Sequence, residues 1–236
     1  MANNKILRVA HLYGNLMNTY GDLGNILVLK YYAQKLGVGL TVDLISLHDE
    51  FDATKYDFVL FGGGQDFEQQ LVSTDLVQPA KRVGLTKYIK SGGVMLAVCG
   101  GYQLLGQYYI GAAGQKIKGA GILPHYTKSQ KNHRFIGDIK IKNQETGQIF
   151  RGFENHNGLT YLGSGERPLG EVLVGKGNNG TDKTEGAIYK NVFCSYMHGV
   201  ILARNGELAK RILGLALAHA KIDCGDKFTD LAVESY

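Results

Sequence analysis

A cysteine stands where the apolar run 94–98, a predicted buried strand, meets a helix-compatible stretch. Cys99 is followed directly by Gly100 and Gly101, and glycines let the chain turn sharply without a clash at Cβ. Such a turn exposes the sulfur at the strand end, and the glycine amides and the helix N-terminus then face developing negative charge. A lone cysteine in an apolar strand is usually inert packing, so the double glycine is the feature that indicates a nucleophile.

A nucleophilic cysteine needs a base or a cation beside it to react at neutral pH. Among the seven histidines, His198 is the best placed, because it ends the strand-like run 192–197 and precedes Gly199. Sites in open parallel sheets form at the carboxyl ends of strands, so Cys99 and His198 are expected at one edge of the sheet. His11, at a strand end, is expected to be structural. His125 and His133, in a basic loop region, are expected at the surface.

A triple glycine, Gly62–Gly64, follows the short apolar run 58–61. It can place a backbone N–H opposite that of Gly100, and two such donors form an oxyanion hole. A phosphate-binding loop is the alternative, although GxxxxGK[ST] is absent and segment 14–24 does not fit GxGxxG. A tetrahedral intermediate of acyl transfer is therefore favoured over a nucleotide as the anion that binds here.

The composition is that of a single α/β unit. The chain has 236 residues with 33 glycines and only 3 prolines, which fits frequent tight turns between strands and helices. No apolar run is long enough to span a bilayer, and the segment 1–5 does not read as a signal peptide. Three cysteines without CxxC or metal-ligand spacing indicate a reducing compartment, no disulfide framework and no metal site.

The net charge of +5 is modest. Basic residues gather between positions 116 and 142, and a solvated face or a docking face for an acidic partner explains them better than nucleic-acid binding, because no aromatic residues are interleaved in a recognised motif. The cluster consists of Lys116, Lys118, Lys128, Lys131, Arg134, Lys140 and Lys142.

Strands and helices alternate in the first half, which predicts a doubly wound, mainly parallel sheet with flanking helices. The expected strands are 6–12, 40–47, 58–61 and 94–98, and the expected helices run from a cap at Asp22 to about Leu36, ended by Gly37, and over 77–89. The second half is expected to hold strands 135–141, 170–174, 185–189 and 192–197, a hairpin tip at 175–183 and a helix at 205–219. Residues 1–223 are expected to form one domain, and residues 224–236 a loosely ordered tail.

Three segments together resemble class I glutamine amidotransferases, most closely their CobQ/CobB-like branch. They are Val98-Cys99-Gly100-Gly101-Tyr102-Gln103, the upstream Gly62-Gly63-Gly64-Gln65-Asp66 and the downstream Tyr196-Met197-His198-Gly199. Within that branch, segments 12–25 (LYGNLMNTYGDLGN) and 152–158 (GFENHNG) resemble the stand-alone GatD subunits. The resemblance covers nearly the whole chain and implies a flavodoxin-like architecture.

The resemblance also implies a reaction and a set of site residues. Cys99 attacks the side-chain amide of glutamine, His198 transfers the thiol proton to the departing ammonia, and water hydrolyses the glutamyl thioester. Amides at Gly64 and Gly100 hold the oxyanion. Two further residues are expected to contact glutamine: Gln103, one helical turn past the nucleophile, and Arg134, which can pair with the α-carboxylate.

The biological role follows from the same resemblance. GatD subunits form a heterodimer with a Mur-ligase-like subunit, MurT, that amidates the D-glutamate of lipid II to D-isoglutamine in peptidoglycan synthesis. This chain lacks a Walker A motif, so ATP and Mg²⁺ are expected in the partner and no cofactor here. The expected localisation is cytoplasmic. The alternatives are an ammonia donor for cobyric acid or another corrinoid, and a catalytically silent module that senses glutamine.

One position departs from the class pattern. Class I enzymes usually carry a glutamate two residues after the histidine, where this chain has Val200. An imidazole without an orienting carboxylate is a poorer base. Three explanations remain open: a dyad suffices, another acid of this chain serves, or the partner supplies the acid.

Overall fold

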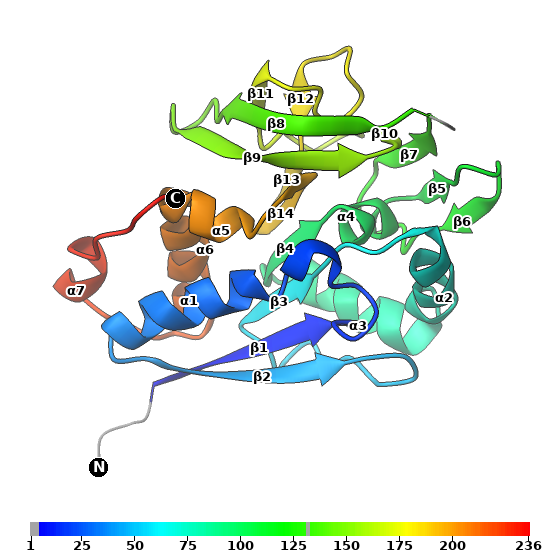
Figure 1. Ribbon diagram of the computed structural model, residues 1–236. Coiled ribbons are helices and arrows are strands. Elements are labelled where there is room, and N and C mark those ends of the chain that lie inside the picture. Colours follow the sequence, from blue (N-terminus) through cyan, green and yellow to red (C-terminus); the bar gives the residue numbers. More distant parts are fainter. Residues whose placement is uncertain (1–4, 131–132) are drawn as a thin grey trace.

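The chain folds around a six-stranded, mainly parallel sheet (Figure 1). The computed structural model describes residues 5–130 and 133–236, so Lys131 of the basic cluster lies outside the described residues. The strand order is β13-β14-β4-β3-β1-β2, and only the β13–β14 pair is antiparallel. The strands are β1 (Ile6–Leu12), β2 (Gly39–Ile45), β3 (Phe58–Phe61), β4 (Val94–Val98), β13 (Ala187–Tyr189) and β14 (Val192–Ser195). The predicted doubly wound sheet is confirmed.

Helices cover both faces of this sheet, and its inner strands β3, β4 and β14 are buried along their whole length. Alternate residues of β4 point to opposite faces: Leu96 joins the cluster formed with α1 (Gly24–Lys35) and α6 (Gly206–His219), and Met95 joins the cluster on the other face. That second cluster includes side chains of α2 (Asp66–Leu76) and α3 (Pro79–Lys90). The two layers of helices hold the carboxyl ends of β3 and β4 in a rigid arrangement.

Helix α2 was not predicted from the sequence. It is polar, but it begins directly after the triple glycine with a capping box, in which the Gln65 backbone N–H donates to Glu68 Oε2 over 3.2 Å. The predicted helix at 77–89 corresponds to α3, whose first residue is a proline, a residue favoured at this position.

Two smaller sheets complete the fold. One has the order β10-β7-β5-β6 and the other the order β12-β11-β8-β9-β15. Their strands are β5 (Tyr108–Ile110), β6 (Lys116–Lys118), β7 (Tyr126–Ser129), β8 (Phe135–Lys142), β9 (Ile149–His156), β10 (Gly158–Tyr161), β11 (Gly170–Val174), β12 (Thr184–Glu185) and β15 (Met197–His198). The expected strands at 135–141 and 170–174 and the hairpin tip at 175–183 are confirmed, whereas β5, β6, β7, β9 and β10 were missed.

Two expected strands are each divided between two sheets. The run 185–189 breaks at Gly186, whose φ of 62° ends the strand, and the run 192–197 breaks at Tyr196. After this second break the chain leaves the central sheet, and β15 pairs with β9, with His198 opposite Phe153. The histidine is therefore carried by the five-stranded sheet, which lies above the central sheet in Figure 1.

The C-terminal segment is ordered, contrary to the expectation of a loose tail. It contains the short helix α7 (Asp226–Thr229), and Leu231 is buried in the core cluster of α1 and α6. The Glu234 backbone N–H donates to the Tyr32 hydroxyl over 3.0 Å. These contacts pack the segment against α1, and the division of the chain at residue 223 stays a prediction.

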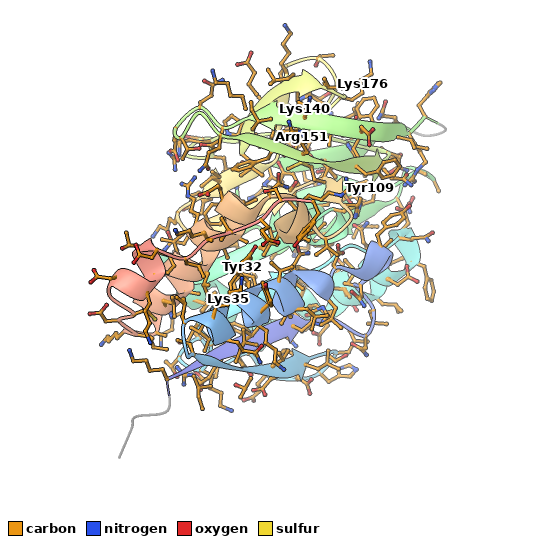
Figure 2. The ribbon with its side chains drawn as sticks, turned by 60° about the vertical axis from the view of Figure 1, so that its left-hand side comes forward. Tyr32, Lys35, Tyr109, Lys140, Arg151 and Lys176 are labelled. Atoms are coloured by element: carbon orange, nitrogen blue, oxygen red, sulfur yellow. The ribbon has the colours of Figure 1, made fainter. Side chains whose placement is uncertain are left out.

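The five-stranded sheet has one buried and one outward face. Ile139 and Phe150 point into the core, while Lys140 and Arg151 lie directly opposite one another on β8 and β9 and point away from it (Figure 2). Among the described residues, neither side chain belongs to a salt bridge. The described helices include none that is both long and apolar enough to cross a membrane.

Candidate active site

Cys99 occupies a strained turn between β4 and the short helix α4 (Gly100–Leu105). Its φ of 49° and ψ of −104° place a non-glycine residue at positive φ, a conformation that persists only where the surrounding structure enforces it. A Cβ on Gly100 would come within 2.9 Å of the Gly64 backbone nitrogen. Only glycine fits directly after the cysteine, and the strand–elbow–helix arrangement predicted from the sequence is present.

A cavity of about 540 Å³ opens at this turn. Five of the six predicted site residues line it: Gly64, Cys99, Gln103, Arg134 and His198. The sixth, Gly100, lies buried against Gly64. The pocket thus brings together elements that are far apart in sequence. They are the segments that follow β3 and β4, the residue that precedes β8, and β15 itself.

The nucleophile and base candidates are both uncharged in this pocket. Burial raises the pKa of the Cys99 thiol to about 12, with a smaller contribution from the Asp22 carboxylate, while the Gly100 amide and Arg134 act in the opposite direction. Burial, together with His156 and Arg134, lowers the pKa of His198 to about 4. A thiol beside a neutral imidazole is the protonation state from which the histidine can act as a general base.

The His198 ring has no competing hydrogen bond within the described residues. It is 1% exposed, and neither ring nitrogen has a hydrogen-bond partner. The Tyr20 ring packs on it with a centroid separation of 4.7 Å. Both nitrogens are therefore available to a substrate or to a further acid, and Tyr20 shields the ring from solvent.

The loop Gly62–Gly64 is fixed from several sides. Gly101 N donates to Gly62 O over 3.0 Å, and the Gln69 side chain donates to Gly64 O over 3.0 Å. Because Gly64 and Gly100 are in contact, their amides lie beside the nucleophile. This geometry suits an oxyanion hole, which requires preorganised backbone donors.

The two predicted substrate contacts differ in how they are held. Gln103 is buried and donates from Nε2 to the Tyr196 hydroxyl over 3.1 Å, and its Oε1 has no hydrogen-bond partner among the described residues. Arg134 is exposed at the rim, where its guanidinium donates to the Asn155 side chain over 3.0 Å and to its backbone oxygen over 3.1 Å. The Asn155 amide in turn donates to the Tyr20 hydroxyl.

Sequence reasoning overlooked several residues of this pocket. Tyr20, Asp66, Asn155, His156 and Asn157 also line it. Most of them lie in the segments that carry the subgroup resemblance, 12–25 and 152–158, so the signal was present without an assigned role. The carboxylate of Asp22, which was expected to cap α1, instead accepts a hydrogen bond from Gly63 N over 2.6 Å.

The expected surface position of His125 is wrong. This ring is fully buried, with Nδ1 2.6 Å from Glu166 Oε1 and Nε2 2.9 Å from the Tyr102 backbone oxygen. The chain between β6 and β7 packs onto α4, because Gly106 leaves room for the imidazole. His133 is exposed, as expected. No cluster of three or more His, Cys, Asp or Glu side chains suited to a metal occurs in the part of the chain that the structure describes.

Residues 8–206 match the CobB/CobQ-like glutamine amidotransferase domain. The chain belongs to this family. It is therefore a glutamine amidotransferase subunit, and the resemblance drawn from the motifs is confirmed.

Two relatives within this family carry the same name, lipid II isoglutaminyl synthase (glutamine-hydrolyzing) subunit GatD. The protein of Streptococcus pneumoniae is 57% identical over 89% of this chain and 80% of its own length. That of Staphylococcus aureus is 38% identical over 97% of this chain and 91% of its own length. A cobyric acid synthase of Chlorobium phaeobacteroides is 30% identical, but only over 65% of this chain and 32% of its own length.

Solved structures agree on the architecture. A crystal structure of a glutamine amidotransferase superposes with a TM-score of 0.57 at 15% identity, covering 88% of this chain and 98% of that chain. At this identity the likeness concerns the fold alone.

The position at which class I amidotransferases usually carry a glutamate is apolar in this family member. Val200 has a φ of 51° and packs against α1 at Gly24. Glu154, the acid opposite Met197 on the paired strand, accepts hydrogen bonds from the backbone N–H groups of Lys176 and Gly177 over 2.7 and 2.9 Å. Among the described residues, no carboxylate is hydrogen-bonded to His198.

Proposed function

We propose that this chain is the glutaminase subunit of a lipid II isoglutaminyl synthase. It hydrolyses glutamine and passes the ammonia to a partner subunit that resembles MurT, a Mur-ligase-like protein. With ATP and Mg²⁺, the partner amidates the D-glutamate of lipid II to D-isoglutamine. Two relatives that it matches over most of their length carry that enzyme's name. The observation that carries the chemistry is a strained Cys99 and an unpaired His198 in one pocket.

The reaction proceeds through a covalent intermediate. The Cys99 sulfur attacks the side-chain amide carbon of glutamine while its proton passes to His198, and the Gly64 and Gly100 amides stabilise the oxyanion. His198 gives its proton to the amide nitrogen, and collapse of the tetrahedral species then breaks the C–N bond and releases ammonia. Water, activated by His198, then hydrolyses the thioester, which releases glutamate and restores the thiol.

The pocket offers groups for the α-amino acid end of glutamine. Arg134 can form a charge-assisted pair with the α-carboxylate, and the unpaired Gln103 Oε1 is available to an N–H of the substrate. Both line the same cavity as Cys99, so the substrate can extend from the rim to the nucleophile.

The partner completes the catalytic group. Val200 replaces the usual glutamate, and both His198 nitrogens lack partners within the described chain. An acid supplied by the docked partner would orient the imidazole and couple ammonia release to the presence of the acceptor enzyme. The isolated chain is accordingly expected to be a weak glutaminase, and the complex a strong one.

The decisive experiment uses a glutamine analogue with an electrophile in place of the side-chain amide. It should label Cys99 alone, and Cys99→Ala should abolish glutamine-dependent amidation of lipid II by the complex while ammonia-dependent amidation continues. Labelling at Cys194 or Cys224 would overturn the nucleophile. Binding of glutamine without any hydrolysis by chain or complex would favour a silent sensor, and amidation of a corrinoid acid instead of lipid II would favour the corrinoid alternative.

A further inference from the structure

Asp22 is a buried carboxylate for which helix capping gives no explanation. It is 1% exposed, and its only side-chain hydrogen bond recorded in the described structure is the one that Oδ2 accepts from Gly63 N. The first turn of α1 is supported differently, because the backbone N–H of Leu23 donates to Asn18 Oδ1 over 2.8 Å. The Asp22 side chain is thus turned away from its own helix and towards the loop Gly62–Gly64.

Gly63 is the point at which this carboxylate meets the reactive pair. A Cβ on Gly63 would lie 3.3 Å from Asp22 Oδ2, 3.3 Å from Cys99 Cβ and 3.4 Å from His198 Cε1. The acid, the nucleophile and the base therefore surround one glycine Cα. Asp22 and His198 are each 1% exposed, and this interior position leaves their charges poorly screened.

Stability does not account for a carboxylate in this position. Burial raises the pKa of Asp22 to about 6, and the Gly63 amide lowers it only in part. No salt bridge to Asp22 occurs among the described residues. A buried carboxylate without a cation is costly, and such groups are concentrated at functional sites.

The carboxylate affects the two sides of the proton transfer differently. Its charge opposes a thiolate on Cys99 and favours a proton on His198. As the sulfur bonds to the amide carbon, the thiol proton moves to His198. The C=O electron pair passes to the amide oxygen, which the Gly64 and Gly100 N–H groups hold, and the sulfur itself is neutral. The imidazolium remains beside the carboxylate, so the attraction is stronger in the transition state than in the resting enzyme.

We propose that Asp22 is a positioning residue for the glutaminase reaction: it fixes the Gly62–Gly64 loop through Gly63 and supplies the negative charge that keeps Cys99 a thiol until His198 takes its proton. This inference rests on the proposed glutaminase function. It concerns a charge held inside this chain, acting across Gly63, and leaves the ring nitrogens of His198 free for an acid from the partner.

Several other titratable groups face Cys99 and must be held constant in a test. They are His198 on β15, His156 on β9, Arg134 before β8, Asp66 on α2 and Tyr196 before β15. Of these groups, only His198 is among the three nearest neighbours of the Gly63 Cβ position, together with Asp22 and Cys99. Substitution at Asp22 therefore changes the nearest acid while leaving these groups in place.

The test measures alkylation of Cys99 by iodoacetamide against pH in the full-length chain, in a Cys224→Ser background because Cys194 is buried. Asp22→Asn keeps an oxygen that can accept the Gly63 N–H but removes the charge. The midpoint of the alkylation profile should fall by on the order of one pH unit. In the complex, kcat for glutamine should fall roughly tenfold to a hundredfold, and Asp22→Ala, which also loses the acceptor, should lose more.

Glu50→Gln is the matched control, because Glu50 is an exposed acid away from the pocket; it should leave both readouts unchanged. An unshifted alkylation profile in folded Asp22→Asn would overturn the proposal. If that variant does not fold, Asp22→Glu, which keeps the charge, is the second test. An alkylation profile of Cys99 like that of the wild type, with a lowered kcat, would support the proposal. A lower midpoint of that profile would contradict it. Alkylation needs no glutamine, so failure of the glutaminase assignment would appear separately, as absent hydrolysis in the wild-type complex.

Discussion

Two buried histidines of this chain have opposite surroundings. His125, between β6 and β7, is saturated, with Glu166 on one ring nitrogen and the Tyr102 carbonyl on the other. His198, on β15, is equally buried, yet neither of its nitrogens has a partner in the described structure. Burial by itself therefore does not distinguish a structural histidine from a reactive one; unused hydrogen-bonding capacity beside a cavity does.

The difference arises from the sheets that carry the two rings. His125 packs onto α4, and its two partners are Glu166, in the loop between β10 and β11, and the Tyr102 carbonyl of α4. His198 lies where the chain leaves the central sheet and pairs with β9, opposite Phe153, in the wall of a cavity of about 540 Å³. His198 thus faces a cavity with both ring nitrogens unpaired among the described residues, whereas both nitrogens of His125 are in use.

The largest effect is expected from replacing the unpaired ring. His198→Ala should lower glutamine turnover by on the order of a hundredfold or more, the usual scale of general acid–base assistance. Thermal stability should change little, because no hydrogen bond of the ring is lost. Steady-state kinetics of the complex and a melting curve check this together; near-normal turnover would transfer the role to His156 or His11.

The saturated ring should show the reverse pattern. His125→Ala leaves the buried Glu166 carboxylate without its partner, and removing one member of a buried pair typically costs about 3–5 kcal/mol of unfolding free energy. Denaturant unfolding should show this loss, while turnover per folded molecule stays near wild type. A variant with unchanged stability but abolished turnover would reverse the comparison between the two histidines.

A smaller, kinetic effect is expected at the rim. Arg134→Ala should raise KM for glutamine roughly tenfold to a hundredfold with a lesser effect on kcat, because a charge-assisted pair with the α-carboxylate is lost. Lys140→Gln is the control, since Lys140 projects from the outer face of β8 (Figure 2). A fall in kcat alone would place Arg134 outside substrate binding.

The comparison extends to a buried acid, Glu185, at the end of β12. Glu185 accepts hydrogen bonds from the Ser195 hydroxyl and the Tyr196 amide, yet its Oε2 has no partner within residues 5–130 and 133–236. Burial raises its pKa from 4.5 to about 8. The folded state therefore holds a proton that the unfolded chain has released, and stability is lost as pH rises from about 4.5 through 8.

Glu185→Gln should flatten this dependence, because a neutral side chain replaces the titrating one. The melting temperature of the wild type should fall between pH 5 and 8, by about 2–4 °C for each kcal/mol lost, and that of the variant should fall less. Identical slopes in the two proteins would show that Glu185 stays ionised in the folded state.

Local sequence determined the nucleophile's surroundings. An apolar strand, a cysteine and two glycines define an elbow because only glycine fits where Gly100 meets Gly64, and alternating strands and helices define the parallel sheet with its edge. The position of His198 at a strand end was also readable, since the apolar run before it marks a strand. These features depend on neighbours in the chain.

Tertiary structure decided everything that depends on distant partners. The break at Tyr196, which moves His198 to β9, leaves no mark in the apolar run 192–197, because a strand pattern does not state which sheet it joins. Asp22 was readable as a helix cap, and only the fold turns it towards Gly63. His125 was placed at the surface because Glu166, its partner, is 41 residues away. Sequence pattern fixes local conformation, but burial and pairing of a polar side chain are set by the elements that pack against it.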